Sequence, residues 1–169
     1  MLLTFVRTVE LRAASWTEID LERGEWRVPA DRMKMREGHI VPLSHQAIEL
    51  LRELQHITGS CRFLFPNQRR PDQCMSPTTI NRALERMGFN GKDSIGFSAH
   101  GFRSTASTML HEAGFRSEVI EKQLAHQDRN KVRASYNHAE YLDERRDMMQ
   151  AWADMVDRMT GSKHGFSRS

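Results

Sequence analysis

Residues 98–107 read Ser98-Ala-His-Gly-Phe-Arg-Ser-Thr-Ala-Ser107, which places His100 and Arg103 three positions apart. Residues at this spacing lie on one face of an α-helix, so both side chains can reach the same ligand. The segment also carries an apolar stripe at helical spacing. The members of this stripe are Ala99, Phe102, Ala106, Met109, Leu110 and Ala113. We therefore expect a helix, ended by Gly114, that holds a polar pair at the border of the core.

Four further residues with chemically useful side chains lie on either side of this segment in the sequence. They are Arg7, Lys34, His126 and Tyr136. Two guanidinium groups can hold the non-bridging oxygens of a phosphate through paired hydrogen bonds. A tyrosine can attack phosphorus when a base removes its proton, and a lysine and two histidines can move protons. Together these side chains can cut and rejoin a phosphodiester without a set of metal ligands.

The order of these residues and their local motifs resemble the catalytic domain of the tyrosine recombinases, specifically the phage and prophage integrases. The motifs are His-x-x-Arg at residues 100–103, Leu124-Ala-His126 and Ala134-Ser-Tyr-Asn-His138. The resemblance extends from about residue 2 to about residue 159. It implies a DNA strand transferase for site-specific recombination and integration that needs no metal, ATP or other cofactor. The catalytic residues it implies are Arg7, Lys34, His100, Arg103, His126 and Tyr136.

The resemblance also assigns a role to each of these side chains. The two arginines would clamp the scissile phosphate, and His126 would hydrogen-bond to it. His100 would accept the proton of Tyr136, and Lys34 would donate a proton to the leaving 5′ oxygen. The products would be a 3′-phosphotyrosine and a free 5′ hydroxyl, so the bond energy is kept for rejoining.

Double-stranded DNA carrying attachment sites is the partner that the resemblance implies. It also implies a homotetramer on DNA and a monomer in isolation. From the composition we expect no membrane association and a cytoplasmic location. We expect one catalytic domain at residues 1–160, without the family's amino-terminal DNA-binding domain, and a disordered tail at residues 161–169.

The nucleophile has a competitor, since the chain contains two tyrosines. In the family the nucleophile lies about nine or ten residues after the histidine of Leu-Gly-His. Tyr136 is ten residues past His126, whereas Tyr141 is fifteen past it and precedes Leu142, where packing is expected. The spacing favours Tyr136.

The first arginine and the lysine also have neighbours of the same charge. The segment Thr4-Phe-Val-Arg-Thr-Val-Glu-Leu11 lacks both glycines of the family's pattern, and Arg12 lies close by. The Arg-x-x-Glu-Leu frame nevertheless fits Arg7 alone. Lys34 stands between Arg32 and Arg36 but is the first lysine in the chain.

The remaining sequence predicts a mixed α+β fold that is mainly α-helical. Aromatic and β-branched runs separated by turns, at residues 16–20, 26–28 and 39–42, predict a small antiparallel three-stranded sheet near the amino terminus. Helical patterns and caps predict helices at the following residues: 2–14, 44–57, 77–87, 98–113, from 117, 128–135 and 142–159.

Composition is that of a globular domain. The chain has 169 residues, 38% hydrophobic and 28% charged, and no apolar run approaches a membrane span. Its net charge of +3 suits a partner with phosphates without demanding one. Two cysteines and no second pair argue against a structural zinc site and for a reducing compartment.

Other functions remain open on the sequence. A non-catalytic DNA-binding module is one, because residues 117–136 resemble a helix-turn-helix in outline. An inactive remnant of a prophage integrase is another. A metal-dependent hydrolase is disfavoured, because the sequence contains no His-Glu-x-x-His motif.

The last predicted helix has two possible partners. Its apolar stripe either packs on its own domain or docks on a neighbouring protomer, as the family's segment after the tyrosine does. The stripe consists of Leu142, Met149, Trp152, Met155, Val156 and Met159, and the charged residues on the other sides include Arg145, Arg146 and Asp147.

Overall fold

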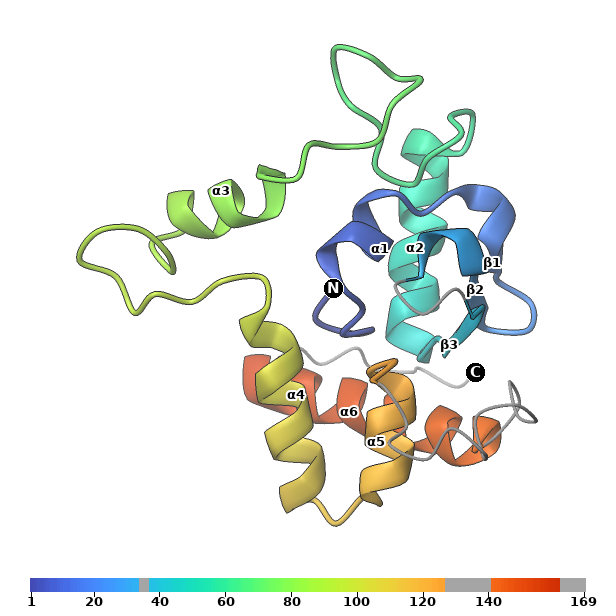
Figure 1. Cartoon of the computed structure of the whole chain (residues 1–169), viewed down its shortest axis with the longest axis vertical. Coiled ribbons are helices and arrows are strands. Elements are labelled where there is room, and N and C mark those ends of the chain that lie inside the picture. Colours follow the sequence, from blue (N-terminus) through green and yellow to red (C-terminus); the bar gives the residue numbers. More distant parts are fainter. Residues whose placement is uncertain (34–36, 127–140, 162–169) are drawn as a thin grey trace.

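The computed structural model describes residues 1–33, 37–126 and 141–161 and shows a mixed α+β fold (Figure 1). The described elements run in the order α1 (Thr8–Arg12), β1 (Ile19–Asp20), β2 (Glu25–Val28), β3 (His39–Pro42), α2 (His45–Thr58), α3 (Thr79–Arg86), α4 (Gly101–Glu112), α5 (Ser117–Gln123) and α6 (Leu142–Thr160). Short 3₁₀ turns at Trp16–Glu18 and Ala30–Arg32 flank the first two strands. Within the described residues no helix is long and apolar enough to cross a membrane.

The predicted antiparallel three-stranded sheet is confirmed, with the strands in the order β1-β2-β3. Trp26 of β2 pairs with Ile19 on one side and with Val41 on the other. Gly24 adopts a φ of 62° in the turn before β2, a conformation that glycine reaches without a steric penalty. β3 then leads almost directly into α2, whose cap Ser44 accepts a hydrogen bond from the Ala47 amide at 3.3 Å.

Two buried clusters form the core. One joins the sheet to α2 and includes Trp26, Val41 and Leu64, and the other joins α4, α5 and α6. Phe5 belongs to the helical cluster and is fully buried, whereas the next residue, Val6, belongs to the sheet cluster and is 1% exposed. The backbone just before Arg7 is therefore fixed by both clusters at once.

The helix predicted at residues 2–14 is shorter in the structure, and this prediction was wrong in its extent. Only Thr8–Arg12 are helical, and Phe5 has a φ of 33°. A right-handed helix cannot continue through a residue in the left-handed region. Arg7 consequently caps the start of α1, whereas the sequence pattern had placed it within a longer helix.

The structure shows how α6 is used. Met148, Met149, Trp152, Ala153 and Val156 are buried, and all of them except Ala153 belong to the helical cluster that α6 forms with α4 and α5. Of the two partners considered for the apolar stripe, the helix therefore packs on its own domain. Arg145 was expected on the polar side of this helix, and that prediction was wrong, because its side chain is fully buried.

α3 lies on the long connection between α2 and α4, away from the other helices (Figure 1). The helix predicted at residues 128–135 lies outside the described residues, as do Lys34, Tyr136 and the tail from residue 162 onward.

Candidate active site

Arg7 is held at the start of α1 by an acid one turn later. Its backbone N–H donates to Glu10 Oε2 at 2.7 Å, and its Nη1 donates to Glu10 Oε1 at 2.8 Å. Nη2 donates to the carbonyl of Ala125 at 2.9 Å. Because Glu10 is only 2% exposed while the Arg7 side chain is 29% exposed, a buried carboxylate orients a guanidinium that still reaches the surface.

Arg103 projects from α4 toward the same place and is 4% exposed. Its Nη1 donates to the Phe5 carbonyl at 2.5 Å and its Nη2 to the Leu124 carbonyl at 2.6 Å. Burial, and next the positive charge of Arg7, lower the pKa of Arg103. The two arginines thus meet at the consecutive carbonyls of Leu124 and Ala125, just past the end of α5.

His126 completes this group. Its Nδ1 lies 2.6 Å from Glu121 Oε2, and its Nε2 lies 3.4 Å from Arg103 Nη2. A carboxylate accepts only, so the Nδ1 proton is the donor toward Glu121 and Nε2 is the nitrogen that faces Arg103. Ala125, directly before the histidine, has a φ of 49°, and this left-handed turn separates His126 from the helical residues of α5.

His100 occupies the cap position of α4, and its side chain is exposed. Its carbonyl accepts a hydrogen bond from the Arg103 amide at 3.1 Å, so His100 and Arg103 lie one turn apart at the start of α4. Among the described residues the His100 side chain makes no hydrogen bond that ties it to Arg7 or His126. The structure therefore brings Arg7, Arg103 and His126 together and leaves His100 near them by its place on α4.

A small cavity of about 70 Å³ lies beside this cluster. Arg7, His126, Lys122 and Arg145 contribute cationic or basic groups to its wall, and Met33 and Glu37 line it as well. Met33 and Glu37 are the described residues on either side of the segment that holds Lys34. Lys34 and Tyr136 themselves lie outside the described residues, so their placement in the site stays a prediction.

The competitors that the structure describes are engaged elsewhere, and Arg36 lies outside the described residues. Arg12 donates to the Met75 carbonyl at 3.2 Å, and Arg32 pairs with Glu18. Tyr141 packs against the helical cluster, with the Arg116 guanidinium 5.1 Å from its ring centre. The packing role expected for Tyr141 is confirmed, and Arg7 is the arginine of this segment that reaches His126 and Arg103.

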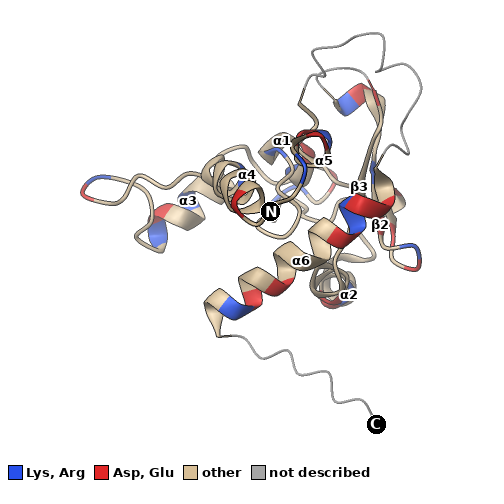
Figure 2. Cartoon of the chain, turned by 90° about the horizontal axis from the view of Figure 1, so that it is seen from below, with Lys and Arg blue, Asp and Glu red and all other residues tan. Residues whose placement is uncertain are grey.

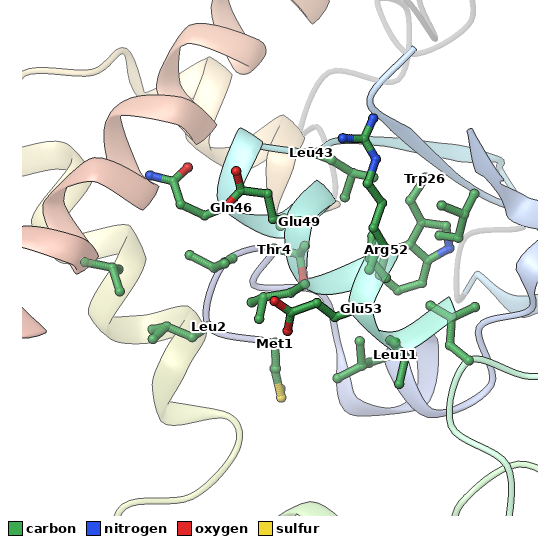
Figure 3. Close-up of a pocket in the computed structure, with 18 of the residues that line it drawn as sticks. Met1, Leu2, Thr4, Leu11, Trp26, Leu43, Gln46, Glu49, Arg52 and Glu53 are labelled. Atoms are coloured by element: carbon green, nitrogen blue, oxygen red, sulfur yellow. The ribbon is translucent and has the colours of Figure 1, made fainter. Parts of the chain in front are cut away.

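A larger cavity, of about 790 Å³, lies in a different part of the molecule (Figure 3). It is lined mainly by apolar side chains of α2 and the first residues of the chain, among them Met1, Leu2 and Leu50, with Glu49 and Arg52 at its wall. None of the four predicted catalytic residues that the structure describes lines it. No group of acids, histidines and cysteines suited to a metal ion occurs among the described residues either.

Sequence reasoning missed the acids that orient the site. Glu10 was used only as part of a motif frame, although its position three residues after Arg7 was a usable signal. Glu121 lies five residues before His126, and no periodic pattern indicates that contact. Arg145, His39 and Gln123, which meet behind the cavity, gave no sequence signal at all.

Residues 1–142 of the chain match the sequence pattern of the phage integrase family. The chain is 47% identical over 155 residues to prophage integrase IntA of Escherichia coli (strain K12), covering 92% of this chain and 37% of that protein. It is 48% identical over 170 residues to an integrase of Enterobacteria phage P4, with 92% and 38% covered. The chain thus spans somewhat more than a third of the length of these relatives.

Solved structures show the same fold. The XerA recombinase matches with a TM-score of 0.61 at 17% identity, over 96% of this chain and 55% of that one. An integrase from mycobacterium phage Brujita matches with a TM-score of 0.61 at 22% identity, over 88% and 48%. The expected fold class is therefore confirmed.

Proposed function

Because the chain belongs to the phage integrase family, we propose that it is the catalytic part of a site-specific DNA recombinase. The observation that supports this most directly is the convergence of Arg7, Arg103 and His126 at the end of α5. Three side chains from separate segments, two of them permanently cationic, present donors to one small region. Such a group suits a phosphodiester and stabilises the extra negative charge of its transition state.

The two arginines bind the non-bridging oxygens of the scissile phosphate. A guanidinium has five N–H donors, and Arg7 uses two of its side-chain donors toward Glu10 and Ala125 within the described residues. His126 hydrogen-bonds to the same phosphate, and Glu121 holds the orientation of its ring through Nδ1. Lys122 at the cavity wall adds to the positive field.

Tyr136 is the nucleophile in this proposal. Its phenolic oxygen attacks phosphorus, its proton passes to His100, and the 5′ oxygen leaves with a proton from Lys34. One phosphorus–oxygen bond forms as another breaks, which leaves a 3′-phosphotyrosine and a free 5′ hydroxyl. Attack by another 5′ hydroxyl reverses the step, so strand exchange consumes no ATP and needs no metal ion.

Double-stranded DNA with attachment sites is the proposed substrate. The XerH site-specific recombinase, a structural relative with a TM-score of 0.58, was solved bound to its difH substrate. The Tn1549 transposon integrase, with a TM-score of 0.61, was solved with circular intermediate DNA. By analogy we propose a tetramer on DNA, a monomer without it, action in the cytoplasm and residues 1–160 as the catalytic unit.

A covalent adduct distinguishes this function from a DNA-binding module or an inactive remnant. The full chain is incubated with a pool of nicked duplexes of randomised sequence, and denaturing electrophoresis then separates protein that carries DNA. We expect an adduct with the wild type and with Tyr141→Phe, and none with Tyr136→Phe, while DNA binding persists in all three. Binding without any wild-type adduct would mean that the chain is a non-catalytic module.

A further inference from the structure

A buried polar junction lies directly behind the site. We define it as His39 on β3, Gln123 on α5 and Arg145 on α6, which are 7%, 1% and 0% exposed. Arg145 donates from Nε and Nη2 to Gln123 Oε1, at 3.0 and 2.7 Å, and also donates to the Ile40 carbonyl. His39 Nε2 lies 3.1 Å from the Gln123 carbonyl. One glutamine and one arginine thus join three elements.

The junction also reaches the segment that carries Arg7. Gln123 Nε2 donates to the Thr4 carbonyl in a long hydrogen bond of 3.4 Å. Arg145 and His39 line the small cavity that Arg7 and His126 border. The junction therefore forms one wall of the site. Its hydrogen bonds, as described above, do not include the side chains of Arg7 and His126.

Each segment that meets here leads to a proposed catalytic residue. Thr4 is three residues before Arg7, and Gln123 is three residues before His126. His39 is five residues after Lys34, and Arg145 is nine residues after Tyr136. Arg7 and His126 are thus each three residues away from a member of one buried set of hydrogen bonds.

Buried polar and charged side chains such as those of the junction are unusual in a protein core. A buried arginine without a carboxylate partner among the described residues is destabilised by desolvation, which lowers the pKa of Arg145 to about 10. His39 is kept neutral, because burial and then the charge of Arg145 lower its pKa to about 3. Apolar residues of the same volume fill such a space at least as well. Directional hydrogen bonds fix the relative placement of the joined segments, which apolar packing does less strictly.

From this geometry we infer that Gln123 and Arg145 are positioning residues, which hold the segments of Arg7 and His126 in register for strand cleavage. The inference rests on the proposed function. A displacement of about 1 Å in a reacting group can reduce a rate about 100-fold, so the junction acts on the chemical step more than on DNA binding.

The test removes the charge and its acceptor together. In the double variant Gln123→Met/Arg145→Met the buried charge disappears with its side-chain acceptor, and only the Thr4 and Ile40 carbonyls lose a donor. Unbranched apolar chains of similar length fill the space. We expect a melting temperature near that of the wild type, a Kd for DNA within about threefold, and a single-turnover cleavage rate at saturating DNA reduced about 100-fold. Arg145→Lys keeps the positive charge but lacks the planar guanidinium group. We expect it to reduce the single-turnover cleavage rate about tenfold.

Val156→Ala is the matched control, because it removes buried volume on the same helix, eleven residues beyond Arg145. It should lower the melting temperature and leave the rate at saturating DNA unchanged. If the wild type forms an adduct and the double variant cleaves at the same saturating rate, the positioning role is wrong and the function stands. If the double variant does not fold, Arg145→Lys decides in the same way. A wild type that forms no adduct contradicts the proposed function instead.

Discussion

Arg7, Arg103 and His126 are placed by acceptors that are far apart in the sequence. Arg103 binds carbonyls 98 residues before it and 21 residues after it, and Arg7 binds one that lies 118 residues away. The identity of these three residues was predictable from motifs and spacing. Their orientation was not, because it depends on backbone carbonyls, which every residue carries and which leave no mark on the sequence.

Ala125 holds a conformation that favours glycine. Its φ of 49° lies in the left-handed region, and its carbonyl accepts the Arg7 guanidinium. The strain for a residue with a Cβ is about 1 kcal/mol. We predict that Ala125→Gly raises the free energy of unfolding in urea by up to about 1 kcal/mol. Ala113→Gly, at an exposed position of ordinary φ, serves as the control, and equal or greater stabilisation there would contradict the role of strain.

His39 makes the stability of the chain depend on pH. Its pKa is about 3 when folded, against 6.5 in an unfolded chain, because burial, and then the charges of Arg145, Lys122 and Arg7, oppose protonation. Below pH 6.5 the unfolded chain binds a proton that the folded chain does not, so stability falls as pH falls through this range. We expect a loss of about 2 kcal/mol between pH 7 and pH 5, measured by urea unfolding. The loss should disappear in His39→Gln, and an unchanged pH profile in that variant would show that other groups are responsible.

At the scale of elements, periodicity predicted the position of α2, α4, α6 and the three strands. It failed where one residue decides the outcome. Phe5, with its φ of 33°, ends the expected amino-terminal helix, and Arg145 is buried although its charge suggested the surface. Both depend on tertiary contacts between the sheet and the helices, which local propensity does not contain.

α6 is expected to be essential for folding. Trp152 is 1% exposed, meets Phe5 edge-on at 6.0 Å and donates its indole N–H to the Leu2 carbonyl at 2.9 Å. We predict that Trp152→Ala lowers the free energy of unfolding by about 3–5 kcal/mol. Met159→Ala, at a side chain that is 57% exposed on the same helix, should change it by less than about 0.5 kcal/mol.

Deletion of residues 143–169 removes nearly all of α6 from the core, so we expect it to unfold the chain. Circular dichroism should show that the shortened chain is unfolded. A folded, monomeric chain after this deletion would mean that the helix is dispensable for its own domain, and docking on a neighbouring protomer would have to be reconsidered.

At the scale of the whole molecule, Lys and Arg are interspersed with Asp and Glu along the helices coloured in Figure 2. The net charge is only +3. We therefore predict weak DNA binding by this chain alone, carried mainly by phosphate contacts. Between 50 and 200 mM salt, counterion release should weaken the affinity about tenfold for every two phosphates that the chain neutralises. Fluorescence anisotropy with labelled duplexes measures this, and tight binding that is insensitive to salt would contradict it.

We propose above all that Tyr136 forms a covalent bond with DNA at a site built from Arg7, Arg103 and His126. The most direct measurement is mass spectrometry of the trapped adduct after nuclease and protease digestion. We expect a peptide that contains Tyr136 and carries a nucleotide linked through its 3′ phosphate to the phenolic oxygen. A nucleotide on Tyr141 or on any other residue, or a 5′-phosphate linkage, would contradict it.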